Sequence, residues 1–210
     1  MPNFDFEISF GKKNKVIGVD EVGRGPLAGP VVSCACIYLD YKINESFLSL
    51  INDSKKISAK KRLEIFKKIN FIKKKGKLNY KIGFASVEEI DKYNILEATK
   101  ISMKRAIEKF NYNSPNLIID GKIGFDKTNK KIKEIINGDK KSYSIASASI
   151  IAKVIRDRYM SILGMKYPVY KWGKNVGYGT QQHIHEIYKN GITSHHRKSF
   201  EPIKSLIHKK

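Results

Sequence analysis

Short apolar runs and longer amphipathic stretches alternate along the chain, and their lengths distinguish strands from helices. Four short runs rich in β-branched residues predict strands. They cover residues 16–20, 31–39, 77–86 and 116–120. The first and last of these runs end directly in acidic residues, which strand interiors disfavour.

Capping residues and apolar spacing predict helices between and after these strands. Ser58 is placed to cap a helix over residues 60–72. The apolar side of this helix is expected to carry Leu63, Phe66, Ile69 and Ile72. Two adjoining helices are expected over 87–93 and 95–110, and a last one over 200–207.

Two more helices are expected in the second half of the chain. Ser142 or Ser144 can cap a helix that runs to about Leu163, with Gly164 as the stop. Thr180 can cap a helix through Tyr188 that ends near Gly191.

Strands therefore dominate the first half of the chain and helices the second, which predicts an α/β domain with a sheet covered by helices. No internal repeat and no Pro- or Ser-rich linker interrupts the sequence, so we expect a single domain over residues 1–210. This length is enough to bury a substantial core.

Carboxylates at strand ends are the strongest chemical signal. Asp20 and Glu21 follow one strand and Asp120 ends another. If these strands are neighbours in the sheet, the three acids converge and repel one another, and a divalent cation relieves that repulsion. Asp120 precedes Gly121, so a simple Asp-Gly turn also explains this acid when it is taken alone.

A fourth acid is needed if two metal ions are to be held, and spacing alone leaves two candidates open. Asp139 lies in a loop, where ligand-binding residues concentrate. Asp157 lies late in a predicted helix with Lys153 four residues earlier, which is the spacing of an ordinary surface ion pair. Ser142 and Ser149 are expected to have capping and packing roles only.

A basic, glycine-rich loop follows the first two acids. Gly23 and Gly25 permit backbone conformations and close approaches that other residues resist. Arg24 between them can contact a phosphate, and Pro26 and Pro30 restrict the rest of the loop.

The formal net charge of +21 has two explanations that the sequence does not separate. It suits a polyanionic partner such as nucleic acid. It also suits a genome rich in A/T codons, because Lys, Ile and Asn are all abundant. His183, His185, His195 and His196 lie in polar, basic sequence, which predicts helix and loop surface rather than a zinc site or a general base.

The cysteines and the lack of long apolar runs indicate the cellular compartment. Cys34 and Cys36 lie two apart in a predicted strand, so they should face the same side of the sheet without bridging easily. A reducing cytoplasm is the simplest interpretation. No apolar run reaches the roughly 18 residues of a membrane span, and residues 1–15 lack the apolar segment of a signal peptide.

Five segments carry a resemblance to a known family. Residues 19–30, VDEVGRGPLAGP, resemble the signature of the ribonuclease HII family. Residues 53–58, 118–121, 148–157 and 177–180, the last followed by His183, agree with it in the same order. The resemblance spans about residues 14–204.

The resemblance implies an RNase H-like fold, with a mixed central sheet flanked by helices and a helix-rich C-terminal part. It implies cleavage of the RNA strand in RNA–DNA hybrids and incision 5′ of single ribonucleotides in duplex DNA. By position, Asp20, Glu21, Asp120 and Asp139 match the family's catalytic and metal-binding carboxylates. Two Mg²⁺ or Mn²⁺ ions would act there, leaving 5′-phosphate and 3′-hydroxyl ends.

Substrate-binding residues are implied in the same way. Gly23, Arg24 and Gly25 would contact the 2′-hydroxyl that distinguishes RNA from DNA, and Tyr178 would pack on the neighbouring sugar. Lys55 and Lys56 would bind phosphates of the duplex. The expected roles are primer removal and ribonucleotide repair, carried out by a monomer.

Two alternatives stand beside this interpretation. Ribonuclease HIII, a related hybrid nuclease, carries an additional N-terminal domain, whereas only residues 1–15 precede the first predicted strand here. A non-catalytic basic RNA-binding protein would explain the charge, but it would not explain four acids at strand ends and loops.

Overall fold

The computed structural model of the chain describes all residues except 12–13, 52–56, 127–128, 130 and 209–210. Its centre is a five-stranded sheet in the order β3-β2-β1-β4-β5. The strands are β1 (Val16–Val22), β2 (Val31–Tyr38), β3 (Leu78–Ala85), β4 (Asn116–Asp120) and β5 (Ile132–Ile135). β1 pairs in parallel with β4, and β4 with β5, whereas β2 is antiparallel to both of its neighbours.

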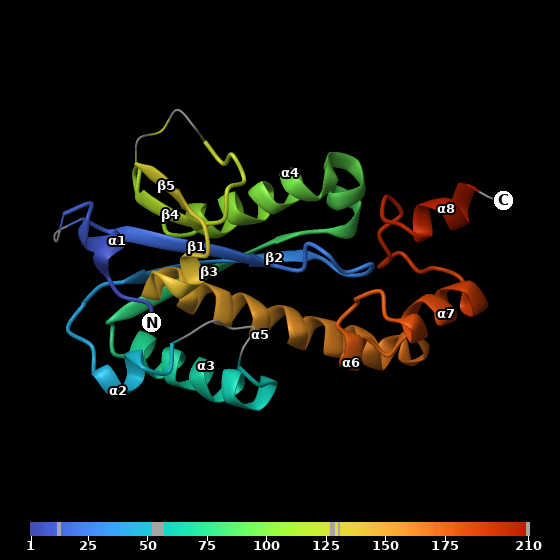
Figure 1. The fold of residues 1–210 in the computed structure, drawn as a ribbon, viewed down its shortest axis with the longest axis horizontal. Helices are drawn as coiled ribbons and strands as arrows, with labels where there is room; N and C mark the ends of the chain where they lie inside the picture. Colours follow the sequence, from blue (N-terminus) through green and yellow to red (C-terminus); the bar gives the residue numbers. More distant parts are fainter. Residues whose placement is uncertain (12–13, 52–56, 127–128, 130, 209–210) are drawn as a thin grey trace.

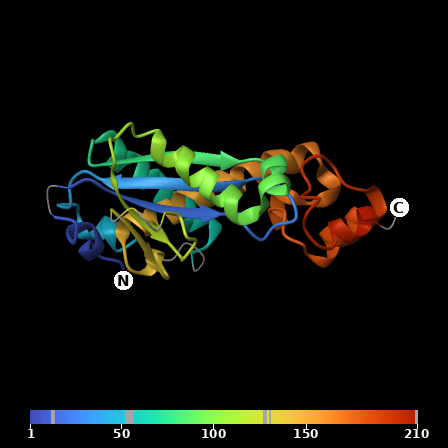
Figure 2. The ribbon, with the colours of Figure 1, turned by 90° about the horizontal axis from the view of Figure 1, so that it is seen from above.

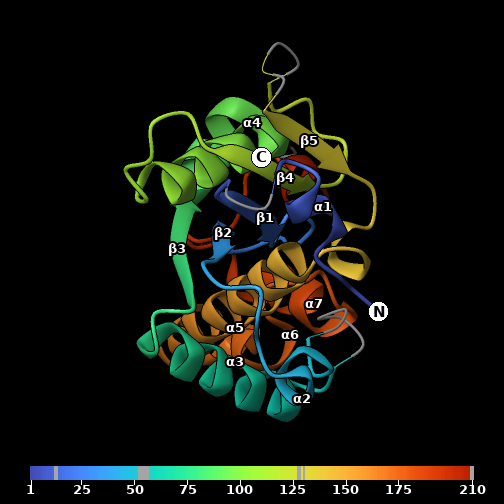
Figure 3. The same ribbon diagram turned by 90° about the vertical axis from the view of Figure 1, so that its left-hand side faces the viewer.

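Helices cover both faces of this sheet (Figures 1 and 3). On one face, α3 (Ala59–Lys74) and α5 (Tyr143–Lys166) enclose a core that includes Cys34, Cys36 and Ile69. On the other face, α4 (Val87–Glu108) packs over Ile17, Val19 and Ile119. The expected mixed α/β architecture is therefore confirmed, and the two free cysteines face the same side, as their spacing predicted.

The remaining elements are short and lie mostly towards the ends of the chain. They are α1 (Asp5–Ile8), α2 (Glu45–Leu48), η1 (Gly138–Lys140), η2 (Pro168–Tyr170), α6 (Trp172–Asn175), α7 (Gln181–Asn190) and α8 (Ile203–His208). The molecule is elongated, with the N-terminus towards one end and the C-terminal helices α6 to α8 gathered at the other (Figure 2). These helices pack on Leu27 and Ala28, in the loop after β1.

Capping explains several helix boundaries that the sequence predicted. Ser58, Ser142 and Thr180 each accept a hydrogen bond from a backbone N–H in the first turn of α3, α5 and α7. Ser142, rather than Ser144, is the cap of α5. The two helices expected over 87–93 and 95–110 form α4, with a break at Asn94, where φ is 68°.

Two predictions of local structure were wrong, and one strand was missed. Gly164 does not end α5; a Cβ there would lie 2.6 Å from the backbone nitrogen of Gly173, so this glycine allows a close helix contact instead. Leu63 is exposed, and Ile65 takes its place on the buried side of α3. The strand β5 was not predicted, because its four residues form a short sheet edge with little apolar pattern.

Candidate active site

Parallel pairing of β1 with β4 brings two acids together. The register aligns Val19 with Ile119, so the next residues, Asp20 and Asp120, lie on neighbouring strands at the same level. Side chains alternate along a strand, and Ile118, two residues before Asp120, packs on Ile145 of α5. Both acids therefore project towards the face of the sheet that α5 covers.

Asp20 is buried, with only 5% of its surface exposed. Burial, and then repulsion from Glu21 and Asp120, raises the pKa of its carboxyl well above the usual range. The Ser149 hydroxyl and the Glu21 backbone N–H each hydrogen-bond this carboxyl and oppose that shift. Ser149 thus contacts the cluster directly, a role beyond the packing that the sequence suggested.

Glu21 follows on β1 and contributes to the same cluster. Burial raises the pKa of its carboxyl, Arg24 opposes the shift, and Asp120 adds to it. Its Oε1 lies 3.4 Å from the Arg24 guanidinium. Its Oε2 is buried and has no hydrogen-bond partner in the described part of the chain. Such an orphaned carboxylate oxygen is costly unless a ligand or water satisfies it.

Asp139 lies in the short helix η1, which follows β5. It is 6% exposed, and the preceding Gly138 N–H donates to Asp120 Oδ1 at 2.6 Å. This hydrogen bond holds the start of η1, one residue before Asp139, against the Asp120 carboxylate. Asp157 is held elsewhere, by Lys153 at 2.8 Å and Arg62 at 3.6 Å. The ion pair expected between Asp157 and Lys153 is confirmed.

The four acids fit a hard divalent cation, although the side chains as placed do not form a closed site. Among the described residues, no three His, Cys, Asp or Glu side chains are gathered tightly enough to hold a metal ion. Even so, the available donors are all carboxylate oxygens. Glu21 Oε2 is buried and has no hydrogen-bond partner among the described residues. The Asp20 carboxylate is repelled by Glu21 and Asp120. Divalent cations of the Mg²⁺ and Mn²⁺ type take such donors.

The loop after β1 borders this cluster. Gly23 has φ of 96°, and a Cβ there would lie 2.2 Å from Arg156 Nε, so only glycine fits. Gly25 is exposed, and its missing side chain would lie 3.6 Å from the Tyr178 ring. Arg24 and Tyr178 are also exposed. The structure thus brings Gly25 and Tyr178 together, although they are far apart in the sequence.

Two arginines that hold this loop were not predicted as site residues. Arg156 of α5 and Arg197 are fully buried and donate to backbone carbonyls of residues 23–30. Arg156 occupies the buried side of α5, four residues after Ala152 and four before Met160. The burial of Arg156 could have been predicted, because a charged residue stands among apolar residues on one face of the predicted helix. Arg197 lies outside the helices, so helical spacing does not predict its burial.

The prediction that the histidines lie on the surface was wrong for His183 and His196, which are 0% and 1% exposed. Trp172 Nε1 donates to His183 Nε2 at 3.0 Å, so His183 carries its proton on Nδ1 and donates to the Tyr178 carbonyl at 2.8 Å. His196 Nδ1 accepts from the Thr193 N–H. Burial lowers the pKa of both imidazoles, so they pack as neutral groups.

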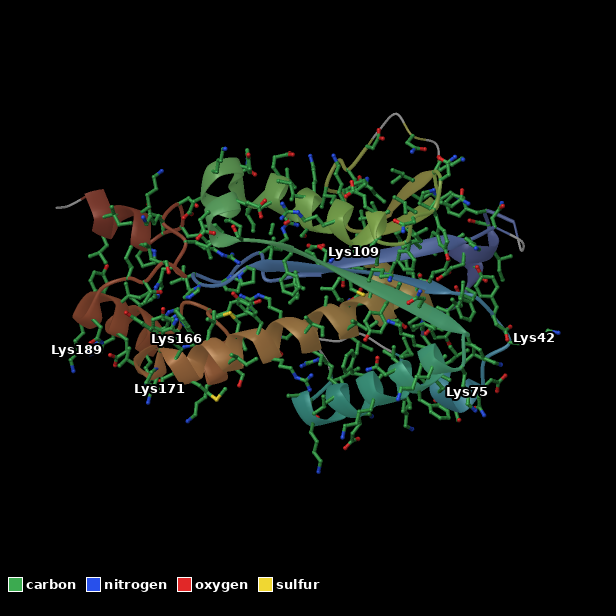
Figure 4. All side chains as sticks on the ribbon, turned by 180° about the vertical axis from the view of Figure 1, so that it is seen from behind. Lys42, Lys75, Lys109, Lys166, Lys171 and Lys189 are labelled. Carbon is green, nitrogen blue, oxygen red and sulfur yellow. The ribbon has the colours of Figure 1, made fainter. Side chains whose placement is uncertain are left out.

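Positive charge is distributed over the whole molecule. Figure 4 labels six lysines that lie from one end of the molecule to the other: Lys42, Lys75, Lys109, Lys166, Lys171 and Lys189. Lys55 and Lys56, the expected phosphate contacts, lie outside the described residues. No described helix has the length and apolar character needed to cross a membrane.

A mixed sheet with carboxylates at neighbouring parallel strands, flanked by helices, is the architecture of RNase H-like nucleases, and comparisons with known proteins agree. Residues 17–203 match the family model described as Ribonuclease HII. A Ribonuclease HII of Wolbachia pipientis subsp. Culex pipiens (strain wPip) is 48% identical over 202 residues, covering 96% of this chain and 98% of the relative.

Solved structures show the same fold. In the complex of PCNA with ribonuclease HII from Archaeoglobus fulgidus, the similar chain superposes with a TM-score of 0.70 at 24% identity, covering 89% of this chain and 95% of that one. Bst-RNase HIII in complex with Mn²⁺ gives 0.65 at 17% identity, covering 93% and 70%. The chain therefore belongs to the ribonuclease HII family, and it is a hydrolase that acts as an endonuclease of the ribonuclease H type.

Proposed function

We propose that this protein hydrolyses the RNA strand of RNA–DNA hybrids and also cuts duplex DNA 5′ of a single embedded ribonucleotide. One observation carries the proposal: the parallel pairing of β1 and β4 sets Asp20 beside Asp120, with Glu21 interacting with both. Gathering buried acids in this way is unfavourable for folding alone, and it suits chemistry on a phosphodiester.

Asp20, Glu21, Asp120 and Asp139 are the residues that would hold two Mg²⁺ or Mn²⁺ ions. Such ions, when bound, supply a water activated for in-line attack and stabilise the leaving 3′ oxygen, giving 5′-phosphate and 3′-hydroxyl ends. A structurally similar protein, Bst-RNase HIII, was solved in complex with Mn²⁺, which supports a divalent metal as the cofactor.

The chain itself orients these carboxylates. The Glu21 N–H donates to Asp20 Oδ1 at 2.7 Å, and the Gly138 N–H donates to Asp120 Oδ1 at 2.6 Å. Each acid therefore has one carboxylate oxygen held by a backbone donor, and the Ser149 hydroxyl also holds the Asp20 carboxyl. Fixing the donors before substrate arrives reduces the reorganisation that the reaction requires.

The loop after β1 would determine which substrate is bound. Gly23, Arg24 and Gly25 would contact the 2′-hydroxyl and an adjacent phosphate, and Tyr178 would pack on the neighbouring sugar. The short distance between Gly25 and Tyr178 supports a joint role. We also assign phosphate binding to Lys55 and Lys56, on their position in the family pattern.

In the cell, this activity would remove ribonucleotides from DNA and degrade RNA primers. The free thiols of Cys34 and Cys36 support a reducing, cytoplasmic location. Because one chain contributes all four acids and the loop, residues 1–210 would work as one catalytic domain and as a monomer.

The test is nicking of a labelled duplex that contains one ribonucleotide, in EDTA, Mg²⁺ and Mn²⁺. The unaltered protein should nick only with a divalent ion. Asp20→Asn should bind the duplex normally but cut at least about a thousandfold more slowly, which corresponds to about 4 kcal/mol of transition-state stabilisation.

Asp157→Asn is the matched control, because it makes the same change at an acid of α5 that pairs with Lys153 and Arg62. Binding without nicking under every metal condition would favour the non-catalytic alternative. Normal turnover by Asp20→Asn would overturn the assignment of the acids.

A further inference from the structure

Arg156 and Arg197 are unusual because large, charged side chains rarely lie at zero exposure. Their guanidinium groups make seven hydrogen bonds, and each ends on a backbone carbonyl rather than on a carboxylate. Burial lowers the pKa of Arg156 to about 10 and that of Arg197 to about 9, so both stay charged at neutral pH. Two buried cations bound to one loop call for a functional reason.

Arg197 determines how the glycine-rich loop presents its backbone. Its guanidinium donates to the carbonyl oxygens of Gly23 at 2.6 Å, Arg24 at 2.9 Å and Gly29 at 2.8 Å. In a planar trans peptide, the C=O and the following N–H point in opposite directions. Because the carbonyls of Gly23 and Arg24 face the guanidinium, the N–H groups of Arg24 and Gly25 face away from it.

Those two N–H groups are available to a ligand. Arg24 and Gly25 are exposed, and no hydrogen bond within the described part of the chain uses either N–H. Two adjacent, outward-facing donors suit a hydroxyl or phosphate oxygen.

Arg156 connects this loop to the segment that carries Tyr178. It donates to Ala28 O and Pro30 O, and its remaining nitrogen donates to Val176 O at 2.9 Å, two residues before Tyr178. The Gly23 backbone packs directly against this side chain. The two arginines thus fix both parts of the recognition surface relative to each other.

We propose that Arg156 and Arg197 are positioning residues that set the preference for a ribonucleotide, by aiming the N–H groups of Arg24 and Gly25 and aligning them with Tyr178. The inference rests on the proposed function, since it assumes that this surface recognises the 2′-hydroxyl. Lysine keeps the charge but has no planar fork that can hold several carbonyls at once.

The test measures how strongly the protein prefers a duplex with one ribonucleotide over the same duplex made of DNA, rather than its cleavage activity. Affinity is measured in EDTA for a duplex with one ribonucleotide and for the same duplex made entirely of DNA, well below each variant's Tm. Arg197→Lys should lower the ratio of the two affinities by about tenfold, the effect of losing two hydrogen bonds, while its affinity for DNA stays unchanged. Arg156→Lys, the second variant, should lower the ratio in the same direction.

Ile69→Ala is the control for stability, because Ile69 is fully buried in α3 and does not belong to the loop. It should lower Tm without changing the ratio. An unchanged ratio in both arginine variants, with a lowered ratio in Tyr178→Ala, would overturn the positioning role alone. No discrimination by the unaltered protein would instead count against the proposed function.

Discussion

Among single residues, the proposed function places the chemistry on the carboxylates of Asp20 and Asp120. Burial is the main cause that raises the pKa of Asp20, and repulsion from Glu21 and Asp120 adds to it. The repulsion arises because neighbouring parallel strands lie about 4.8 Å apart and the two acids are in register. The fold tolerates this unfavourable arrangement at a single level of the sheet, where the Gly138 N–H and the Ser149 hydroxyl partly compensate it.

The proposed function gives Asp139 and Asp157 different roles. Asp139→Asn should lower kcat/KM about a hundredfold or more, because it removes one of the four carboxylates proposed to hold the metal ions. Asp157→Asn should leave the cleavage rate nearly unchanged and lower the free energy of unfolding by no more than about 1 kcal/mol, since its ion pairs are partly exposed. Cleavage assays and urea unfolding measure the two effects. An inactive Asp157→Asn beside an active Asp139→Asn would reverse the assignment of the fourth acid.

At the scale of elements, α5 connects the two halves of the site. Its first turns meet the acids through Ser149, and Arg156, two turns later, holds the loop after β1. The same helix then packs against the C-terminal helices through Met160. A single helix therefore sets the distance between the acids and the loop after β1.

The buried His196 should make the stability of the protein depend on pH. Burial, and then repulsion from His183 and His195, lowers the pKa of His196 to about 3 from its usual 6.5. As pH falls from about 6.5 towards 3, His196 binds a proton in the unfolded chain but not in the folded chain. Its contribution to the free energy of unfolding should then fall by up to about 1.4 kcal/mol per pH unit and is fully present above about pH 6.5.

Urea unfolding between about pH 4 and pH 7 measures this effect. His196→Gln should flatten the dependence, whereas His185→Gln, at an exposed position, should retain it. Equal slopes in His196→Gln and the unaltered protein would contradict the assignment of a neutral, buried imidazole.

For the molecule as a whole, sequence patterns predicted the features that depend on neighbouring residues, namely the strands and the starts of helices. Strand composition found β1 to β4, and cap residues found the starts of α3, α5 and α7. The register of β1 with β4 is a long-range property, so the convergence of Asp20 and Asp120 could be predicted only on the condition that the two strands are neighbours. Spacing likewise could not choose between Asp139 and Asp157, because the position of η1 depends on a contact across 18 residues, from Gly138 to Asp120.

Burial in the C-terminal part was harder to predict. His183, His196 and Arg197 sit in polar, basic sequence, yet the packing of α6 and α7 on Leu27 and Ala28 encloses them. Their polar atoms are satisfied by partners distant in the chain, such as Trp172 for His183 and Gly29 for Arg197. The spacing of apolar residues therefore does not predict which polar side chains are buried with hydrogen-bond partners from distant parts of the chain.

The proposed active site is tested most directly by mapping the position of the cut in a duplex that contains one ribonucleotide, with Mg²⁺ and with Mn²⁺. A cluster of Asp20, Glu21, Asp120 and Asp139 beside a loop that contacts the 2′-hydroxyl predicts one cut, 5′ of the ribonucleotide, with 3′-hydroxyl and 5′-phosphate ends. A cut 3′ of the ribonucleotide leaving a cyclic phosphate, or cutting that persists in EDTA, would contradict it.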